Sequence, residues 1–308
     1  MVDARQNVYG RADKGALWML QAKLYLNSEV YTGQERYTEC IEACQKVMNA
    51  GYELNDVYQH LFYADNHLSN EIIFPLIADG TNAQNWGNTT FLVNAAIGGE
   101  MESSDYGTGE AWAGLRTTSA LVEKFPDVTG DTDGRAIFFT TGQSLEIDDI
   151  GEFSEGYAVP KYQNLNQDGT SGSNITHADI DYPMFRLADA YLMYAEAVLR
   201  GGTGGSRGEA LALINELRER AYGNTDGNIA DADLTLDFIL DERARELYWE
   251  ATRRVDLIRY GIYTGGEYLW PWKGGVKEGR ATEEFRDIFP IPAADLIANP
   301  TLTQNEGY

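Results

Sequence analysis

Hydrophobic residues recur at helical spacing in several long segments of the chain. Residues 12–27 and 34–50 each present a broad apolar face, and the short connection between them predicts two antiparallel neighbouring helices. The same periodicity returns over residues 184–200, 207–222 and 234–260, the last of which is interrupted by a short break. Helix pairs of roughly 34 to 40 residues have the size of tetratricopeptide units. The pattern therefore predicts a mainly α fold, built as a scaffold of tetratricopeptide-like helix pairs.

The middle of the chain, residues 51–182, lacks this periodicity and is rich in Gly, Asn, Ser, Thr and Asp. A helix is predicted over residues 114–125, and residues 137–139 and 158–163 are candidates for short strands. One further apolar run covers residues 71–77. Long loop-rich segments in compact proteins usually carry function, so this region is predicted to bind a ligand.

The predicted organisation is a single domain over residues 1–308. A helix pair at residues 12–50 precedes the loop-rich region, and further helix pairs occupy residues 183–260. The tail, residues 261–308, contains four prolines and is predicted to be irregular, since proline disfavours both helix interiors and central strands.

Composition narrows the classes of function that the protein can have. The chain has 24 Lys+Arg against 48 Asp+Glu, a net charge of −24, and 43% hydrophobic residues. A surface this acidic repels phosphate, which argues against nucleic acid as a main partner. No apolar run approaches the roughly 18 residues of a spanning helix, and the polar residues 1–12 do not resemble a signal peptide. Cys40 and Cys44 stand four apart on one helix face, which predicts buried free thiols.

Motifs for catalysis are absent from the sequence. It contains no nucleophile elbow, phosphate-binding loop, dinucleotide fingerprint or His-Glu-x-x-His motif. The three histidines, His60, His67 and His177, do not have metal-ligand spacing. Paired carboxylates arise by chance among 48 acidic residues, so no glycosidase pair can be selected. We therefore predict that the protein is not an enzyme.

Two tryptophans occupy loops rather than apolar periods. Trp86 is flanked by Asn85 and Asn88, and Trp112 follows a Gly-rich segment that begins at Tyr106. Indole rings among amide and hydroxyl side chains suit sugars, whose C–H faces stack on the ring while their hydroxyls bond to amides. These five residues form the predicted glycan site. The alternative is that both rings only anchor a long loop.

Acidic residues of the same region suggest a cation site. Asp179 and Asp181 stand two apart in a loop, and together with Asp65 they offer the oxygen ligands that Ca²⁺ prefers. The sequence has no EF-hand loop, and the alternative is an acidic pair that precedes the helix expected after Pro183. No organic cofactor is predicted.

The other four tryptophans and the charged residues at 242–254 are predicted to have structural roles rather than roles in binding. Trp18 and Trp249 stand in helical periods and are predicted core residues. Trp270 and Trp272 flank a proline and are predicted to pack the tail onto helices. Acidic and basic side chains alternate over residues 242–254, which is typical of ion-paired helix faces rather than of an anion site.

Several segments, spread in one order over nearly the whole chain, carry a family resemblance. They are YGRADK at 9–14, AKLYLN at 22–27, VYTGQ at 30–34, PMFRLADAYLMYAEA at 183–197, RRVDLIRYG at 253–261, YLWPWKGG at 268–275, PIP at 290–292 and QNEGY at 304–308. In these segments the sequence resembles the SusD/RagB family of outer-membrane nutrient-binding lipoproteins, and its starch-binding branch in particular.

The resemblance implies a SusD-like scaffold of tetratricopeptide-like units with a loop-rich binding region. Family members are not enzymes, and they pass glycans to a SusC-like TonB-dependent transporter. Trp86 and Trp112 match aromatic positions of the starch-binding arc. Asp179 and Asp181 match calcium-ligand positions, and a third ligand falls near Asp65 or His67.

The expected function is therefore that of a non-catalytic subunit, which captures starch or malto-oligosaccharide at the extracellular face of the outer membrane. The resemblance covers only the C-terminal part of the family's length, so the signal peptide and the lipid-modified cysteine are expected outside this sequence. The alternatives are a binder of another glycan or of a peptide, a scaffold without binding, and a glycoside hydrolase.

Overall fold

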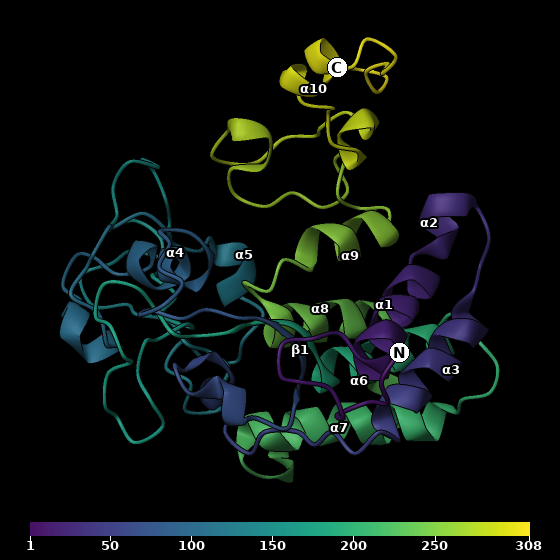
Figure 1. Cartoon of the computed structure of the whole chain (residues 1–308). Coiled ribbons are helices and arrows are strands. Elements are labelled where there is room, and N and C mark those ends of the chain that lie inside the picture. The colour runs from purple at the N-terminus through teal and green to yellow at the C-terminus, as the bar shows by residue number, and fades with distance from the viewer. The chain divides into compact units, whose positions relative to one another are not determined.

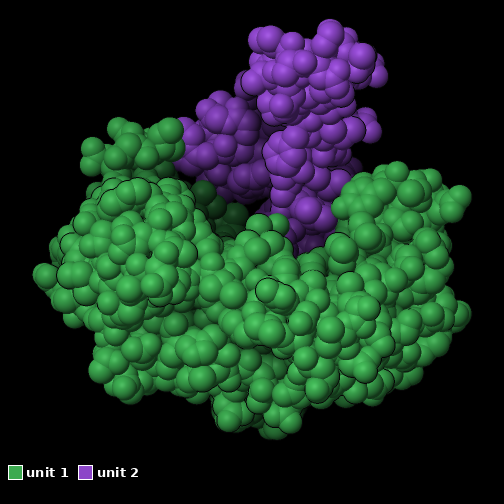
Figure 2. Space-filling model, viewed as in Figure 1, with its two compact units in different colours: residues 1–251 green, residues 252–308 purple.

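The protein is described by a computed structural model that covers residues 1–308. The chain forms two compact units, Met1–Ala251 and Thr252–Tyr308 (Figure 2). This boundary lies nine residues before the start of the irregular tail that the sequence predicts. None of the helices is both long and apolar enough to cross a membrane.

Five helices make the scaffold of the first unit (Figure 1). They are α1 (Lys14–Leu26), α3 (Tyr37–Met48), α6 (Leu187–Leu199), α7 (Arg207–Tyr222) and α8 (Leu236–Leu247). Helix α1 packs on α3, α3 packs on α6, and α6 packs on both α7 and α8. The predicted fold class, a mainly α scaffold of helix pairs, is confirmed.

Local sequence explains where these helices begin and what they bury. The side chains of Asp13, Ser206 and Thr235 cap α1, α7 and α8 by accepting a hydrogen bond from a backbone N–H three residues later. The apolar faces of the helices meet in one core cluster that includes Cys40 and Cys44. Both cysteines are buried free thiols, as predicted.

The two strands of the first unit form a short antiparallel ribbon. Strand β1 (Ile72–Leu76) pairs with β2 (Tyr182–Arg186), and Pro75 lies opposite Pro183. Because neither proline has an N–H to donate, the ribbon is irregular at this point. The helix predicted from residue 184 was therefore placed too early, since residues 184–186 belong to β2 and α6 begins at Leu187.

Other short elements differ from the prediction. Helices α2 (Ser28–Thr32) and α4 (Asn88–Ala95) were not predicted, and α5 (Ser119–Val122) is shorter than the helix expected over residues 114–125. The two expected strands are not formed; Phe139 and Ala158 make only an isolated antiparallel bridge. Short 3₁₀-helices occupy Tyr58–Phe62, Asn66–Leu68, Ser103–Tyr106, Thr225–Gly227, Asp231–Asp233, Lys273–Gly275 and Glu284–Asp287.

The second unit contains α9 (Arg253–Arg259) and α10 (Ala293–Ala298), joined by mostly irregular chain. The break predicted between α8 and α9 is confirmed. Trp249 and Ala251 adopt positive φ angles of 61° and 57° there, which ends the helical path. The Trp249 ring is half-buried and packs against two apolar clusters of the first unit.

Buried ion pairs join the ribbon to helix α8. The guanidinium of Arg186, at the end of β2, contacts Glu71 at 2.9 Å and Glu246 and Glu250 at 2.7 Å each. All four side chains are almost fully buried. The charge alternation in α8 thus reflects ion pairing, as predicted, but the pairs lie inside the protein rather than on a solvated face.

Two further cations fasten the loop-rich region to α8 and to the segment that follows it. Arg135 contacts Glu242 at 2.7 Å and Glu246 at 3.0 Å, and all three side chains are fully buried. The ammonium of Lys161 contacts Glu250 at 2.7 Å and lies 4.1 Å from the centre of the Phe62 ring. These contacts connect the region that carries the candidate site to the helical scaffold.

Acid is expected to weaken this network. Burial raises the pKa of Glu242, but the guanidiniums of Arg135, Arg245 and Arg218 more than offset it and lower the pKa to about 2. Because the carboxylate binds its proton more weakly in the folded state, its contribution to stability is present above about pH 4.5 and is lost as the pH falls toward 2. The loss is roughly 1.4 kcal/mol per pH unit.

Urea unfolding at pH 5 and pH 3 measures this effect. We expect a lower unfolding free energy at pH 3. An equal or higher unfolding free energy at pH 3 would contradict the ionised, paired state of Glu242.

Candidate functional site

The fold brings the two loop tryptophans together on the surface of the first unit. The ring centres of Trp86 and Trp112 lie 5.9 Å apart, and their planes are tilted by 45°. The ring of Phe91 lies 6.2 Å from Trp112, and the imidazole of His177 lies 4.7 Å from Trp86. Trp86 is 56% exposed and Phe91 is 44% exposed. We call Trp86, Phe91, Trp112 and His177 the aromatic platform.

Polar groups border the aromatic platform. The exposed Asn88 amide makes no hydrogen bond within the chain, so it is free for a ligand. The Asn85 amide is instead used locally, because its oxygen accepts from the N–H of Gly87 at 2.9 Å. The Glu110 carboxylate accepts from the Trp112 indole N–H at 3.3 Å. The platform therefore has both an amide and a carboxylate beside its rings.

Helix α4 holds the loop that carries Trp112. The Trp112 N–H donates to the carbonyl of Asn94 at 2.9 Å, and the N–H groups of Ala113 and Gly114 donate to Ile97 and Ala95. The bonds to Asn94 and Ala95 satisfy carbonyls in the last turn of α4, which have no partner within the helix. The loop is thus fixed by backbone contacts, which leave the indole ring on the surface.

Asp179 and Asp181 hold the segment that leads to Trp86. Asp179 accepts from the N–H of Gly80 at 2.7 Å, and Asp181 accepts from the N–H of Ala78 at 2.9 Å. A Cβ on Gly80 would lie 2.2 Å from the carbonyl oxygen of His177, so only glycine permits this approach. The two carboxylates therefore anchor the loop on which Trp86 stands.

Removal of the Asp179 carboxylate should loosen this loop. We expect Asp179→Ala to leave the N–H groups of Gly80 and Ser173 without acceptors, at a cost of about 1–3 kcal/mol. Hydrogen exchange followed by mass spectrometry should then show faster exchange over residues 78–88. Asp179→Asn keeps one acceptor oxygen and serves as the matched control. Unchanged protection in Asp179→Ala would refute the anchoring role.

The structure does not gather the predicted calcium ligands. Asp65 accepts from the Gln167 N–H at 3.1 Å, and Asp181 accepts from the Tyr9 hydroxyl at 2.5 Å. Burial raises the pKa of Asp181 above its usual range. No group of three or more His, Cys, Asp or Glu side chains in residues 1–308 is arranged to hold a metal ion. Calcium binding stays a prediction.

Tyr106 lies apart from the two tryptophans. It is half-buried and packs against an apolar cluster that contains Phe62 and Tyr162, and its carbonyl accepts from the Asn164 N–H. Of the five residues of the predicted glycan site, Trp86, Trp112, Asn85 and Asn88 thus lie at the platform, while the Tyr106 ring contacts neither tryptophan. Its role in binding stays a prediction.

Sequence reasoning missed Phe91, Glu110 and His177. Phe91 lies on α4, which the sequence did not predict, and Glu110 was one of many acidic residues. His177 is far from Trp86 in the sequence, and no sequence motif indicates that the two side chains lie together. Exposed aromatic faces beside an amide and a carboxylate are the surroundings that suit a flat, hydroxyl-rich ring.

Comparison with known proteins agrees with this architecture. The family model described as the SusD family matches residues 142–308, more than half of the chain. The chain belongs to the SusD family. The starch-binding protein SusD of Bacteroides thetaiotaomicron is 36% identical over 355 aligned residues, which include the whole of this chain and 62% of that protein. SusD-like protein P25 of Formosa agariphila is 28% identical over 97% of this chain and 60% of its own length.

Solved structures show the same fold. Surface glycan-binding protein A from Bacteroides thetaiotaomicron superposes with a TM-score of 0.74 at 22% identity. The superposition includes 99% of this chain and 66% of the glycan-binding protein. The same-named protein in complex with laminarihexaose gives a TM-score of 0.73 at 21% identity, with the same coverage. This SusD-family chain thus spans somewhat less than two thirds of the length of these relatives.

Proposed function

We propose that this chain is a non-catalytic glycan-binding protein and that the aromatic platform is its binding surface. The observation that carries the proposal is the placement of Trp86 beside Trp112, with both rings joined into one surface. A sugar ring that stacks on an indole buries its C–H face, and its hydroxyls then reach the Asn88 amide and the Glu110 carboxylate. The starch-binding relative supports this class of ligand.

The preferred ligand is a curved glucan, of which α-1,4-linked starch and malto-oligosaccharide are our first choice. A flat, ribbon-like chain presents its sugar faces in one plane. The indole planes of Trp86 and Trp112 are tilted by 45°, so two neighbouring sugars stack on both only if the chain turns between them. The tilt selects for chain shape rather than for one sugar.

The wider function follows from the family. We propose that the full-length protein is held at the extracellular face of the outer membrane by a lipid anchor. There it would pass oligosaccharide to a SusC-like TonB-dependent transporter. Calcium bound near Asp179 and Asp181 is part of the same proposal, and Ca²⁺ titration followed by calorimetry tests it.

Affinity electrophoresis tests the ligand class. The chain is run in native gels that contain amylopectin, cellulose-derived hydroxyethyl cellulose or dextran. We expect retardation by amylopectin and none by hydroxyethyl cellulose or dextran, because only the first presents a regularly curved α-1,4 chain. Equal retardation by hydroxyethyl cellulose would contradict the selection for curvature.

Three outcomes separate the alternatives. Retardation by the β-1,3-glucan laminarin, without retardation by amylopectin, would indicate that the ligand is a curved glucan with a different linkage. No retardation of the folded chain by any polymer would favour a scaffold that does not bind glycan. Release of reducing sugar from starch would instead indicate a glycoside hydrolase.

A further inference from the structure

A hollow lies within the C-terminal unit and involves none of the residues of the aromatic platform. It has a volume of about 370 Å³ and is lined by residues of two chain segments, 263–274 and 280–286. This volume falls within the range of small-ligand sites. The two segments are fastened to each other by backbone hydrogen bonds, from Gly265 to Thr282 at 2.9 Å and from Arg280 to Lys273 at 3.0 Å. The hollow is thus formed by a fixed part of this unit.

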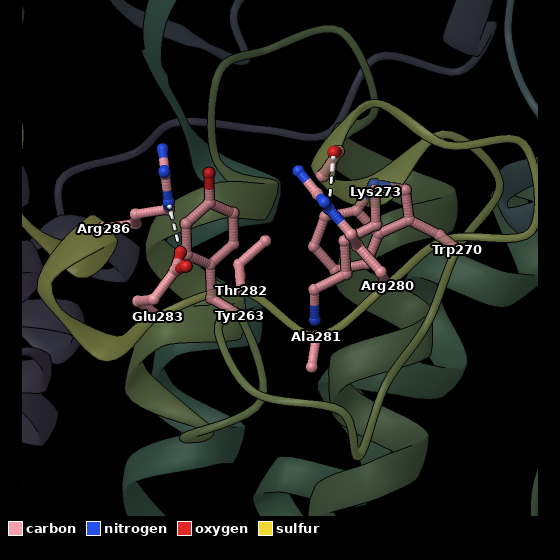
Figure 3. A pocket seen from close by; sticks show the side chains of 9 residues that line it. Tyr263, Trp270, Lys273, Arg280, Ala281, Thr282, Glu283 and Arg286 are labelled. Atoms are coloured by element: carbon pink, nitrogen blue, oxygen red, sulfur yellow. Dashed lines mark hydrogen bonds and ion pairs between the residues drawn. The ribbon is translucent and has the colours of Figure 1, made fainter.

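Two arginines face the hollow with free donors. Arg280 uses its Nε to bond the Gly274 carbonyl at 2.9 Å, and Arg286 uses its Nε to bond Glu283 at 2.9 Å. The terminal nitrogens of both guanidiniums make no hydrogen bond within the protein, and both side chains are exposed. Figure 3 shows the two arginines on opposite sides of the hollow, with the Tyr263 ring and Thr282 between them.

Lys273, the third basic residue that lines the hollow, already has hydrogen-bond partners within the protein. The ammonium of Lys273 is almost fully buried and donates to the carbonyls of Gly265 at 3.0 Å and Tyr268 at 2.7 Å. It also lies 4.5 Å from the centre of the Trp270 ring. Lys273 thus fixes the position of Trp270 and leaves the recognition of a ligand charge to the two arginines.

Charge is unevenly divided between the two units. Residues 252–308 contain 7 basic and 8 acidic residues, whereas residues 1–251 contain 17 and 40. The strongly acidic first unit repels anions, while the second unit is nearly neutral and places two guanidinium groups with unbonded terminal nitrogens at one hollow. Net charge therefore does not disfavour an anionic ligand at this unit.

We propose that this hollow binds the carboxylate of an acidic sugar, a uronate residue. The paired N–H groups of a guanidinium match the two oxygens of a carboxylate. The Glu283 carboxylate accepts from sugar hydroxyls, the Thr282 hydroxyl both donates to them and accepts from them, and Tyr263 and Trp270 supply an aromatic wall. A doubly charged phosphate is disfavoured because the Glu283 carboxylate lies in the same lining.

Titration of the full ¹⁵N-indole-labelled chain tests this proposal. Sodium glucuronate, glucose, sodium acetate and N-acetylglutamate are added separately at constant ionic strength, and the Trp270 indole resonance is followed after its assignment with Trp270→Phe. We expect only glucuronate to shift this resonance in a saturable way. The Trp86→Ala/Trp112→Ala variant should bind glucuronate as the unaltered chain does.

Variants identify the groups responsible. We expect Arg280→Gln/Arg286→Gln to weaken glucuronate binding at least tenfold without a change in the urea midpoint, since both side chains are exposed. Lys46→Gln, which removes an exposed charge from α3, is the matched control and should bind normally. The proposal would be overturned if the double variant bound glucuronate with the affinity of the unaltered chain. It would also be overturned if glucose, acetate or N-acetylglutamate bound as well as glucuronate at the same concentrations. Loss of glucuronate binding in the platform variant would also overturn it.

Discussion

Replacement of Trp86 and Trp112 by alanine should abolish measurable binding of maltoheptaose. Stacking of a sugar on each indole removes apolar surface from water and contributes roughly 25 cal/mol per Å², and every 1.4 kcal/mol is a tenfold change in Kd. We therefore expect each single variant to bind at least about tenfold more weakly and the double variant to show no heat in a calorimetric titration.

The design of this experiment separates binding from folding. Trp86 is 56% exposed, so its loss should leave the urea midpoint unchanged. Tyr31→Ala is the matched control, because Tyr31 is an exposed aromatic residue on α2 outside the platform. The account fails if the double variant binds maltoheptaose with the affinity of the unaltered chain, or if Tyr31→Ala weakens binding as much.

Replacement of Arg186 by methionine should destabilise the protein strongly. It removes the cation shared by Glu71, Glu246 and Glu250 and leaves buried carboxylates without this partner. Breaking a buried ion pair from one side costs about 3–5 kcal/mol, which is a large part of the 5–15 kcal/mol that stabilises a typical domain. Urea unfolding followed by circular dichroism measures the change.

Arg36→Met provides the comparison for this substitution. Arg36 pairs with Glu39 on the surface at 2.8 Å and lies 4.5 Å from the centre of the Tyr25 ring. Exposed pairs and cation–π contacts of this kind are worth about 1 kcal/mol or less. If both methionine variants lost the same small amount of stability, the buried network would not be what joins the ribbon to α8.

Long helices were predictable because one face of each is apolar over many turns. The prediction for α7, residues 207–222, agrees with its observed bounds, and the break between α8 and α9 was also found. Helix α4 was missed because it is only 8 residues long and rich in Thr and Asn, which favour turns as much as helices. Arg186 was misplaced in a helix because the following apolar residues continue the helical period.

The candidate site was predictable in composition but not in geometry. Trp86 and Trp112 were selected because they stand among polar loop residues, and this property is local. Their contact with each other and with His177 depends on hydrogen bonds between distant segments, such as the one from the His177 ring to the carbonyl of Asn85 at 3.1 Å. The anchoring of the Trp86 loop by Asp179 was hidden for the same reason.

The central claim is that a glucan lies on Trp86 and Trp112, and indole resonances report on it most directly. The chain has 6 tryptophans, each with one indole N–H signal that single Trp→Phe variants assign. On addition of maltoheptaose we predict that the signals of Trp86 and Trp112 shift together, with one Kd, while those of Trp18 and Trp270 do not move. Saturable shifts of Trp18 or Trp270, with Trp86 and Trp112 unaffected, would contradict the account.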